Sequence, residues 1–213
     1  MNYLLYIPLI IVCYFIGSTS MAHLIGRLKG FDLREKGSGN LGATNATIEI
    51  SLKAGVITGL YDIGKAVLCC LLAKYLLSAL IPFAVQTAGA SVILGHIFPF
   101  YLGFRGGKGL SCMVGMTLAL DWRLFLAAVL SVILITVILD HIAFATIFLA
   151  IGIPIADGVI EMSWIAFAIL ALPSAVIIIK HFDNVRRIID GTEHGLKELI
   201  FKPKSGNDGP TEK

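Results

Sequence analysis

Charged residues are scarce in this sequence, and two long stretches have none. Only 15% of the 213 residues are charged, whereas 57% are hydrophobic. Soluble domains carry roughly 25% charged residues, so this composition argues against a soluble domain and indicates a membrane protein. Neither residues 1–26 nor residues 75–104 contain Asp, Glu, Lys or Arg. Because such apolar stretches have the length of helices that cross a bilayer, we expect an all-α, integral membrane helical bundle.

The cysteines lack the spacing of a metal site or of a disulfide framework. Cys13, Cys69, Cys70 and Cys112 lie in apolar stretches, and no two of them form a Cys-x-x-Cys pair. We therefore expect buried, reduced thiols, with no metal and no cofactor. The N-terminal stretch also lacks the basic residues and the small-residue cleavage site of a signal peptide, so we interpret it as a retained transmembrane helix.

Apolar stretches that approach the length of a bilayer span predict the helices. We expect helices over residues 3–25, 54–80, 83–98, 142–156 and 162–179, a polar loop at 26–53 and a polar turn at 157–161. Residues 110–139 allow two interpretations. One helix would bury Asp121 and Arg123 near its centre, at about 3 kcal/mol for each charge. Two short helices would instead place residues 121–123 in a turn that reaches water.

The positions of the basic residues favour the two short helices. With seven spans, 14 of the 17 Lys and Arg residues fall on one side of the membrane. The positive-inside rule makes that side cytoplasmic, so we expect about seven transmembrane helices, the N-terminus outside and the C-terminus in the cytoplasm. Residues 1–197 are expected to form a single transmembrane domain, and the polar residues 198–213 a disordered cytoplasmic tail.

A glycine-rich basic loop, Gly103-Phe104-Arg105-Gly106-Gly107-Lys108-Gly109, separates two apolar stretches. Glycine lets backbone N–H groups approach a ligand, and Arg105 and Lys108 add positive charge at the same place. A helix that begins at Lys108 or Gly109 would direct its positive dipole end to this point. The loop therefore predicts a phosphate site at the membrane edge, with a plain basic turn as the alternative. A Walker A motif is excluded, because it would require glycine in place of Leu102 and Ser or Thr in place of Gly109.

A second polar cluster occupies residues 37–45. It mixes glycines with Ser38, Asn40, Thr44 and Asn45, whose side chains both donate and accept hydrogen bonds. Such a mixture suits a polyol or a phosphate, and a flexible linker is the alternative interpretation.

A third cluster follows the last apolar stretch. His181, Asn184 and Arg187 repeat at intervals of three residues, so a helix would present them on one face. This spacing predicts a ligand site, to which Lys180 and Arg186 would add positive charge.

Ionisable residues also occur inside the apolar stretches. Asp62 and Lys65 are three residues apart, which is compatible with a structural ion pair or with a functional role. His96 lies one helical turn before Pro99, close to the glycine loop, and is a candidate site residue. The remaining histidines have no comparable neighbours and are expected to be structural: His23, His141 and His194.

Together these clusters resemble the acyl-phosphate-dependent glycerol-3-phosphate acyltransferases of bacterial membranes. The resemblance rests on residues 37–45, on Gly95-His96 with the segment 104–109, and on residues 181–187. The segment Asp62-Ile63-Gly64-Lys65 is similar to a short Asp-x-x-Lys element of the family. The similarity covers most of the chain.

The resemblance implies transfer of a fatty acyl group from acyl phosphate to the 1-hydroxyl of glycerol 3-phosphate, which yields lysophosphatidic acid and phosphate for phospholipid synthesis. The implied catalytic residues are Ser38, His96, Lys108, His181 and Asn184. The implied substrate-binding residues are Gly39, Asn40, Thr44, Asn45, Lys65, Arg105, Gly106, Gly107, Gly109 and Arg187. The backbone of residues 106–109 would cradle the acyl-phosphate leaving group.

The resemblance also implies a multi-pass protein of the cytoplasmic membrane whose active site faces the cytoplasm. Its expected partners are acyl phosphate and glycerol 3-phosphate as substrates, membrane lipid, and the enzyme of the same pathway that forms the acyl phosphate. Nucleic acid is not expected. Acyltransferases that use thioesters commonly carry a His-x-x-x-x-Asp motif, and none of the five histidines here has an aspartate five residues later.

The sequence departs from the family pattern at several positions. Ile48 stands where the family usually has an arginine, Ala143 where a hydroxyl is common, and Leu110-Ser111-Cys112 where Val-Ala-Thr is usual. A diverged acyltransferase with another acceptor is therefore an alternative, as is a membrane transporter for an organic phosphate. The proton of the acceptor hydroxyl has three candidate destinations, which are His96, His181 and a substrate phosphate oxygen.

Overall fold

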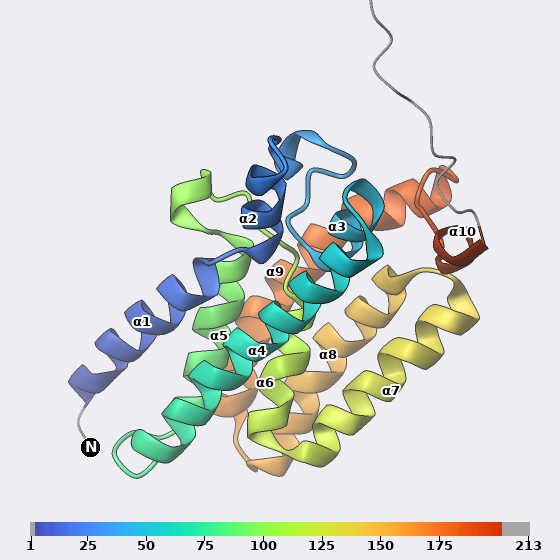
Figure 1. Cartoon of the computed structure of the whole chain (residues 1–213). Coiled ribbons are helices and arrows are strands. Elements are labelled where there is room, and N and C mark those ends of the chain that lie inside the picture. Colours follow the sequence, from blue (N-terminus) through green and yellow to red (C-terminus); the bar gives the residue numbers. More distant parts are fainter. Residues whose placement is uncertain (1–2, 202–213) are drawn as a thin grey trace, which may run out of the picture.

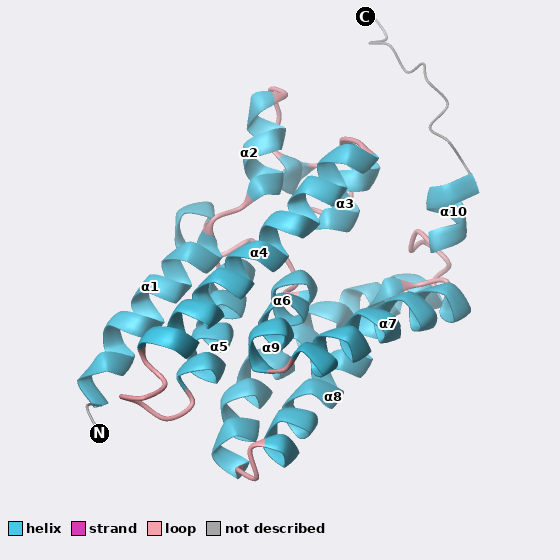
Figure 2. Cartoon of the chain, turned by 60° about the horizontal axis from the view of Figure 1, so that its bottom comes forward, coloured by secondary structure: helices cyan, strands magenta, loops and turns pink. Residues whose placement is uncertain are grey.

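The structure is a computed structural model that describes residues 3–201 of the chain. Every regular element within those residues is helical, which confirms the expected all-α class (Figure 2). In chain order the elements are η1 (Tyr3–Leu5), α1 (Tyr6–Ser18), α2 (Met21–Leu28), η2 (Leu33–Glu35), α3 (Ala43–Glu49), α4 (Leu52–Leu76), α5 (Ala84–Ile97), η3 (Phe100–Leu102), α6 (Leu110–Leu120), α7 (Trp122–Leu139), α8 (Ile142–Ile160), α9 (Trp164–Ile189) and α10 (Leu196–Phe201).

Most of these helices have the length and composition of membrane spans. Within the described residues, six helical stretches are long and apolar enough to cross a membrane. α6 is also apolar but has only 11 residues, which is about 16 Å of helix against a bilayer core of roughly 30 Å. The expected membrane helical bundle is therefore present, whereas the number of seven spans and the orientation of the termini stay predictions.

The turns of the bundle are divided between its two ends (Figure 1). α3, the carboxyl end of α9 and α10 lie together at one end. The turns that join α4 to α5, α6 to α7 and α8 to α9 lie at the opposite end. The second and third polar clusters of the sequence, residues 37–45 and 181–187, are consequently brought to the same end of the molecule.

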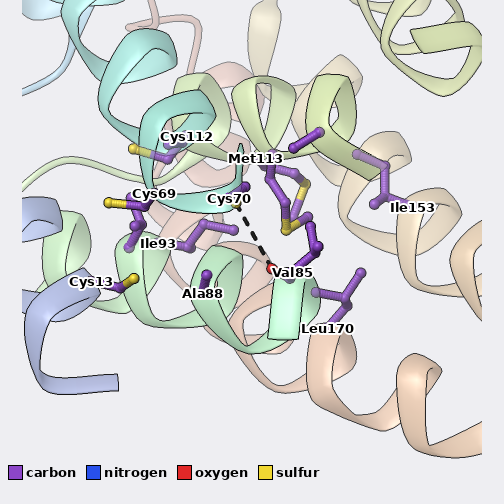
Figure 3. Packing of buried hydrophobic residues seen from close by; sticks show 14 of the residues in the cluster. Cys13, Cys69, Cys70, Val85, Ala88, Ile93, Cys112, Met113, Ile153 and Leu170 are labelled. Atoms are coloured by element: carbon purple, nitrogen blue, oxygen red, sulfur yellow. Dashed lines mark hydrogen bonds between the residues drawn. The ribbon is translucent and has the colours of Figure 1, made fainter. Parts of the chain in front are cut away.

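α5 is the central helix and packs against α1, α4, α6 and α9. It is rich in Ala, Gly and Ser, and almost all of its residues are buried. Small side chains let neighbouring helices approach closely in a membrane, where packing replaces the hydrophobic effect as the driving force. The core around α5 contains all four cysteines, which are buried and unpaired, as expected (Figure 3).

The first apolar stretch does not form the single helix expected over residues 3–25. The chain breaks between α1 and α2, where the Ser20 side chain caps α2 by accepting a hydrogen bond from the backbone N of His23 at 3.2 Å. Carbonyl groups near the break are available because the helix is interrupted. Lys65 Nζ donates to two of them, Gly17 O at 2.8 Å and Thr19 O at 2.7 Å. A buried ammonium group from α4 therefore stabilises the break.

Residues 110–139 form two helices, as the two-helix interpretation predicted. α6 ends and α7 begins at Asp121, whose side chain accepts a hydrogen bond from the backbone N of Arg123 at 2.6 Å. Trp122 is exposed beside them. The charged residues therefore lie in a turn and not at the centre of a helix.

Three predicted helix ends were wrong, and the first is that of α4, which ends at Leu76 and not at residue 80. Residues 157–160 of the expected polar turn belong to α8, and Asp157 is buried, where Gln86 Nε2 donates to its carboxylate at 3.2 Å. The last helix was expected to end at residue 179 but continues to Ile189. In α8 the polar Asp157 has Gln86 as a partner inside the bundle, and in α9 the polar His181 bonds to the backbone of its own helix. The polarity of these residues therefore did not end either helix.

The polar segments contain more structure than expected. The predicted loop at 26–53 includes α3 and is tied to η3 by Arg34, whose Nη1 donates to Leu102 O at 2.8 Å. Hydrogen bonds from Arg34 hold the pKa of Asp32 well below its usual range. Residues 198–201 of the predicted disordered tail belong to α10, and residues 202–213 lie outside the described residues.

Candidate functional site

The three polar clusters open onto one cavity of about 500 Å³. This volume is within the range of small-molecule sites. Its walls are the segment 37–45 with the rest of α3, the residues around the start of α6, the end of α9 and the segment that follows α9. Single residues of α4 and α5 and two residues of α8 complete the lining.

Ten of the fifteen predicted site residues line this cavity. They are Ser38, Asn40, Thr44, Asn45, His96, Lys108, Gly109, His181, Asn184 and Arg187. The other five do not line it, and they are Gly39, Lys65, Arg105, Gly106 and Gly107.

The third cluster lies on one face of α9, as its spacing predicted. His181, Asn184 and Arg187 all face the cavity. Lys108 reaches them from the glycine loop, and its Nζ donates a hydrogen bond to Asn184 Oδ1. A contact between residues 76 positions apart therefore joins the glycine loop to the third cluster.

Glu193 is a site residue that the sequence interpretation missed. Its Oε1 accepts a hydrogen bond from Asn184 Nδ2 at 2.5 Å, and its Oε2 pairs with Arg187 Nε at 2.6 Å. A single glutamate in a polar segment after the last helix belongs to no recognisable motif. Only the return of this segment over α9 brings the carboxylate to the site.

The Lys108 ammonium group is in an environment that disfavours its charge. Burial, together with the positive charge of Arg187, lowers the pKa of Lys108 to about 8, against the opposing effect of Glu193. A bound phosphate would offset this unfavourable environment, because it would supply negative charge close to both cations.

The ring of His181 has a defined orientation. Its Nδ1 lies 2.8 Å from Ile177 O, and the ring is buried. A backbone carbonyl can only accept a hydrogen bond, so Nδ1 carries the hydrogen and Nε2 keeps its lone pair. His181 can therefore accept a proton from a group bound in the cavity.

A buried charged cluster forms the floor of the cavity. Lys65 Nζ lies 2.8 Å from Asp62 Oδ1 and 3.1 Å from His96 Nδ1, and His96 Nδ1 lies 3.4 Å from Asp62 Oδ1. Buried charges require such partners, because removing them from water without compensation is strongly unfavourable. Asp62 and His96 line the cavity, whereas Lys65 lies behind them.

The same floor contains residue types that bind metal ions. Asp62, His96 and Cys112 offer ligand atoms within 4.8 Å of one another. The ammonium group of Lys65 already contacts both Asp62 and His96, so these two side chains have a cationic partner within the protein.

The glycine loop differs from the expected phosphate cradle. The backbone N–H groups of Gly106 and Gly107 donate to Ile97 O at 3.1 Å and to His96 O at 3.0 Å, so they are not available to a ligand. A Cβ atom at Gly107 would lie 2.0 Å from His96 Nε2. These two glycines therefore allow close packing of the loop against His96.

The structure also tests the predicted start of the helix after the glycine loop and the predicted site residues Arg105 and Gly39. α6 begins at Leu110, one residue after the later of the two expected starts, and its amino end lines the cavity. Arg105 is exposed and outside the cavity. Gly39 belongs to a turn in which its backbone N–H donates to Lys36 O at 2.9 Å.

Asn45 is a structural residue as well as a cavity residue. Its Oδ1 accepts from the backbone N of Ser38 at 3.1 Å, and its Nδ2 donates to Asn40 O at 2.9 Å and to Lys36 O at 3.2 Å. With its amide used in this way, the side chain holds the shape of segment 36–45 and has little capacity left for a ligand.

Several cavity residues were not predicted as site residues. The polar ones, besides Asp62 and Glu193, are Glu49, Ser111, Thr146, Thr192 and His194. His194 had been expected to be structural without a role at the site. None of these residues stands in a distinctive local pattern, because the segments that carry them become neighbours only in the folded bundle.

The sequence matches a known protein family over most of its length. The family model described as glycerol-3-phosphate acyltransferase matches residues 7–191. A glycerol-3-phosphate acyltransferase of Parasynechococcus marenigrum is 34% identical over 187 residues, which are 87% of this chain and 87% of the relative. Glycerol-3-phosphate acyltransferase 2 of Bacillus anthracis is 36% identical over 189 residues, which are 88% of this chain and 97% of the relative.

Two solved structures have a similar fold. Both are crystal structures of PlsY, an integral membrane glycerol 3-phosphate acyltransferase. The glycerol 3-phosphate form has a TM-score of 0.83 and 30% sequence identity, over 92% of this chain and 97% of PlsY. The lysophosphatidic acid form has a TM-score of 0.80 and 29% identity, over 92% of this chain and 99% of PlsY.

Proposed function

Because this chain belongs to the glycerol-3-phosphate acyltransferase family, we propose that it transfers a fatty acyl group from an acyl phosphate to the 1-hydroxyl of glycerol 3-phosphate. The products are lysophosphatidic acid and inorganic phosphate. Family membership makes the chain a multi-pass membrane acyltransferase of phospholipid synthesis. The acyl-phosphate donor, the position of the hydroxyl and the roles of individual residues are the content of the proposal.

The observation that carries the proposal is the convergence of Lys108, Asn184 and Arg187 beside His181 in one cavity. Two cations and the amino end of α6 provide positive charge for phosphate groups. Both proposed substrates carry phosphate, and the acyl chain of one of them requires an apolar environment. A cationic cavity at the end of a membrane bundle meets both requirements.

The chemistry asks mainly for positioning and for charge stabilisation, because an acyl phosphate is already activated. The oxygen of the acceptor hydroxyl attacks the acyl carbon, the bond from that carbon to the phosphate oxygen breaks, and phosphate leaves. We assign Lys108 and Arg187 to the phosphate groups. Ser38, Asn40 and Thr44 line the same cavity and provide hydrogen bonds for the glycerol and phosphate oxygens.

We assign the proton of the hydroxyl to His181. Its Nε2 retains a lone pair, because Nδ1 donates to Ile177 O. His96 is less suitable, since Lys65 and Asp62 contact its Nδ1 and Gly107 packs against its Nε2 side. The proton passes from the hydroxyl to His181 Nε2 and then to the departing phosphate.

We place the protein in the cytoplasmic membrane with this cavity facing the cytoplasm. Most of its basic residues lie in the segments at the cavity end of the bundle, which is the distribution of a cytoplasmic face. The enzyme that forms the acyl phosphate is a natural partner on that side.

The choice of donor is tested with purified protein and glycerol 3-phosphate. Palmitoyl phosphate and palmitoyl-CoA are supplied in separate reactions, and lysophosphatidic acid is measured. We expect product from palmitoyl phosphate, with release of one phosphate for each lysophosphatidic acid formed. Product from the CoA ester alone would contradict the proposal.

The assignment of the base is tested with His181→Gln. Glutamine can still donate a hydrogen bond but cannot accept the proton, so kcat should fall roughly 100-fold or more while KM changes little. His141→Gln serves as the control, because His141 is outside the cavity. A His181→Gln protein with nearly normal kcat would return the role of base to a substrate phosphate oxygen.

A further inference from the structure

Glu193 occupies the cationic part of the cavity with its own carboxylate. One oxygen accepts from Asn184 Nδ2 at 2.5 Å and the other pairs with Arg187 Nε at 2.6 Å. Asn184 is in turn bonded to Lys108. The carboxylate therefore contacts Arg187, which the proposed function assigns to a substrate phosphate, together with Asn184, the partner of Lys108, and it presents two oxygens to them as a phosphate would.

A substrate phosphate and Glu193 cannot both keep these contacts. The Arg187 Nε atom has a single hydrogen, and Glu193 uses it. A phosphate dianion placed beside an ionised carboxylate would also be repelled, and the repulsion is strong in a partly buried site. A phosphate that takes over the contacts with Arg187 Nε and Asn184 Nδ2 therefore displaces the carboxylate.

The segment that carries Glu193 is a short connection attached to the end of α9. It lies between α9 and α10 and follows Gly191, whose φ of +69° favours glycine. The backbone N–H groups of Thr192 and Glu193 both bond to Arg187 O, at 2.8 and 3.2 Å.

The far end of the segment is attached to the turn between α7 and α8. There the backbone N of Leu196 donates to Asp140 O at 2.7 Å, and the backbone N of Lys197 donates to Asp140 Oδ1 at 2.9 Å. The side chain of Glu193 is thus held over the cavity by a short connection with an anchor at each end.

We propose that Glu193 is a placeholder that selects for phosphate: it fills the cationic subsite when the site is empty and gives way only to a ligand group of higher charge. A ligand carboxylate gains no more from Arg187 than Glu193 already does, whereas a phosphate dianion brings more charge and a third acceptor oxygen. The subsite therefore discriminates between phosphate and carboxylate ligands. This inference rests on the proposed function, because it takes the substrate phosphate to bind at Arg187 and Asn184.

The first test measures equilibrium binding to the purified full-length protein by calorimetry, with glycerol 3-phosphate and with glycerate as the carboxylate analogue. Glu193→Gln removes the charge but keeps the size of the side chain. We expect it to bind glycerol 3-phosphate roughly tenfold more tightly and to bind glycerate with less discrimination than the wild type.

Asp190→Asn is the matched control. Asp190 is an exposed carboxylate at the end of α9, outside the cavity, so its loss changes the net charge equally without freeing Arg187. Its binding constants should remain within about twofold of the wild type. A folded Glu193→Gln protein that binds glycerol 3-phosphate no better than the wild type would contradict the proposed role of Glu193.

A second measurement uses the wild type and remains decisive if Glu193→Gln does not fold. Hydrogen exchange of the backbone is followed with and without saturating glycerol 3-phosphate. We expect exchange to increase at residues 191–195, as the segment is released, and to decrease at residues 37–45. Protection at residues 37–45 without faster exchange at residues 191–195 would contradict the proposed role of Glu193 but not the proposed function. No response in either segment would contradict the proposed function as well.

Discussion

At the scale of single residues, Lys108 connects the glycine loop to α9. Its Nζ bonds to Asn184, and Arg187 is close enough to lower its pKa. The protein itself stabilises the positive charge of Lys108 poorly, and an anionic ligand would stabilise it well. Two predictions follow from this situation.

Lys108→Ala should reduce kcat/KM for glycerol 3-phosphate roughly 10- to 100-fold, because it removes a charge-assisted contact worth about 1.5–3 kcal/mol. Arg123→Ala is the control, since Arg123 lies at the turn between α6 and α7, at the other end of the bundle. Steady-state kinetics on both proteins provides the measurement. Equal losses in the two variants would mean that the site has been placed wrongly.

The pH dependence of kcat/KM should also reflect Lys108. Its pKa is lowered to about 8, so the ammonium form that binds phosphate is present below this pH and is lost as the pH rises through it. We expect kcat/KM for glycerol 3-phosphate to decline above about pH 8. In Lys108→Arg the side chain stays charged, and this alkaline decline should disappear. An unchanged profile in Lys108→Arg would assign the decline to another group.

At the scale of elements, the glycine loop is a packed connection and not an open cradle. Gly106 and Gly107 bond to the carbonyl groups at the end of α5, and this fixes the direction in which α6 leaves. α9 has a double role, because its first part is a membrane helix and its last turns present His181, Asn184 and Arg187 to the cavity.

Gly107→Ala should destabilise the protein and reduce activity, because its Cβ would lie 2.0 Å from the ring of His96. We expect a loss of about 1–3 kcal/mol, typical of overpacking in a core, which thermal unfolding in detergent would detect as a lower Tm.

Gly152→Ala is the matched control in α8. Its Cβ would meet nothing within 4 Å, and alanine stabilises a helix interior by about 0.5–1 kcal/mol relative to glycine. The Tm of this variant should be equal to or above that of the wild type. If Gly107→Ala were as stable and active as Gly152→Ala, the tight packing of the loop on His96 would be refuted.

At the scale of the whole molecule, the span count depends on α6. If this short helix crosses the membrane with its neighbours, residues 35 and 190 lie on one side and residue 122 on the other. If α6 does not cross, residues 35 and 190 lie on opposite sides. The positive charge of the sequence favours the first arrangement.

Single-cysteine labelling decides between these arrangements. Glu35→Cys, Trp122→Cys and Asp190→Cys change exposed residues, and the four native cysteines are buried, so background labelling should be low. With a membrane-impermeant maleimide on intact cells, we expect Trp122→Cys to react and the other two to react only after permeabilisation. Reaction of Asp190→Cys in intact cells would rule out a cytoplasmic end for α9.

Local features of the sequence determined the helical class, the approximate position of most helices and ten of the cavity residues. The physical reason is that helix formation in a membrane depends on the apolarity of a single segment, whose backbone groups bond within that segment. Helical periodicity is equally local, so His181, Asn184 and Arg187 could be placed on one face before the bundle was known. The two-helix form of residues 110–139 could be predicted because it places most basic residues on one side of the membrane, and because burying Asp121 and Arg123 inside one helix is unfavourable.

Tertiary contacts decided the rest. Lys65 stabilises the break between α1 and α2 through Gly17, which is 48 positions away in the chain. The N–H groups of Gly106 and Gly107 have partners at the end of α5, and Asn45 is occupied by its own loop. Glu193 reaches the site because its segment returns over α9. In each case a polar group is satisfied by a partner that no local pattern identifies, since hydrogen bonds and ion pairs depend on which segments the packing of the helices brings together.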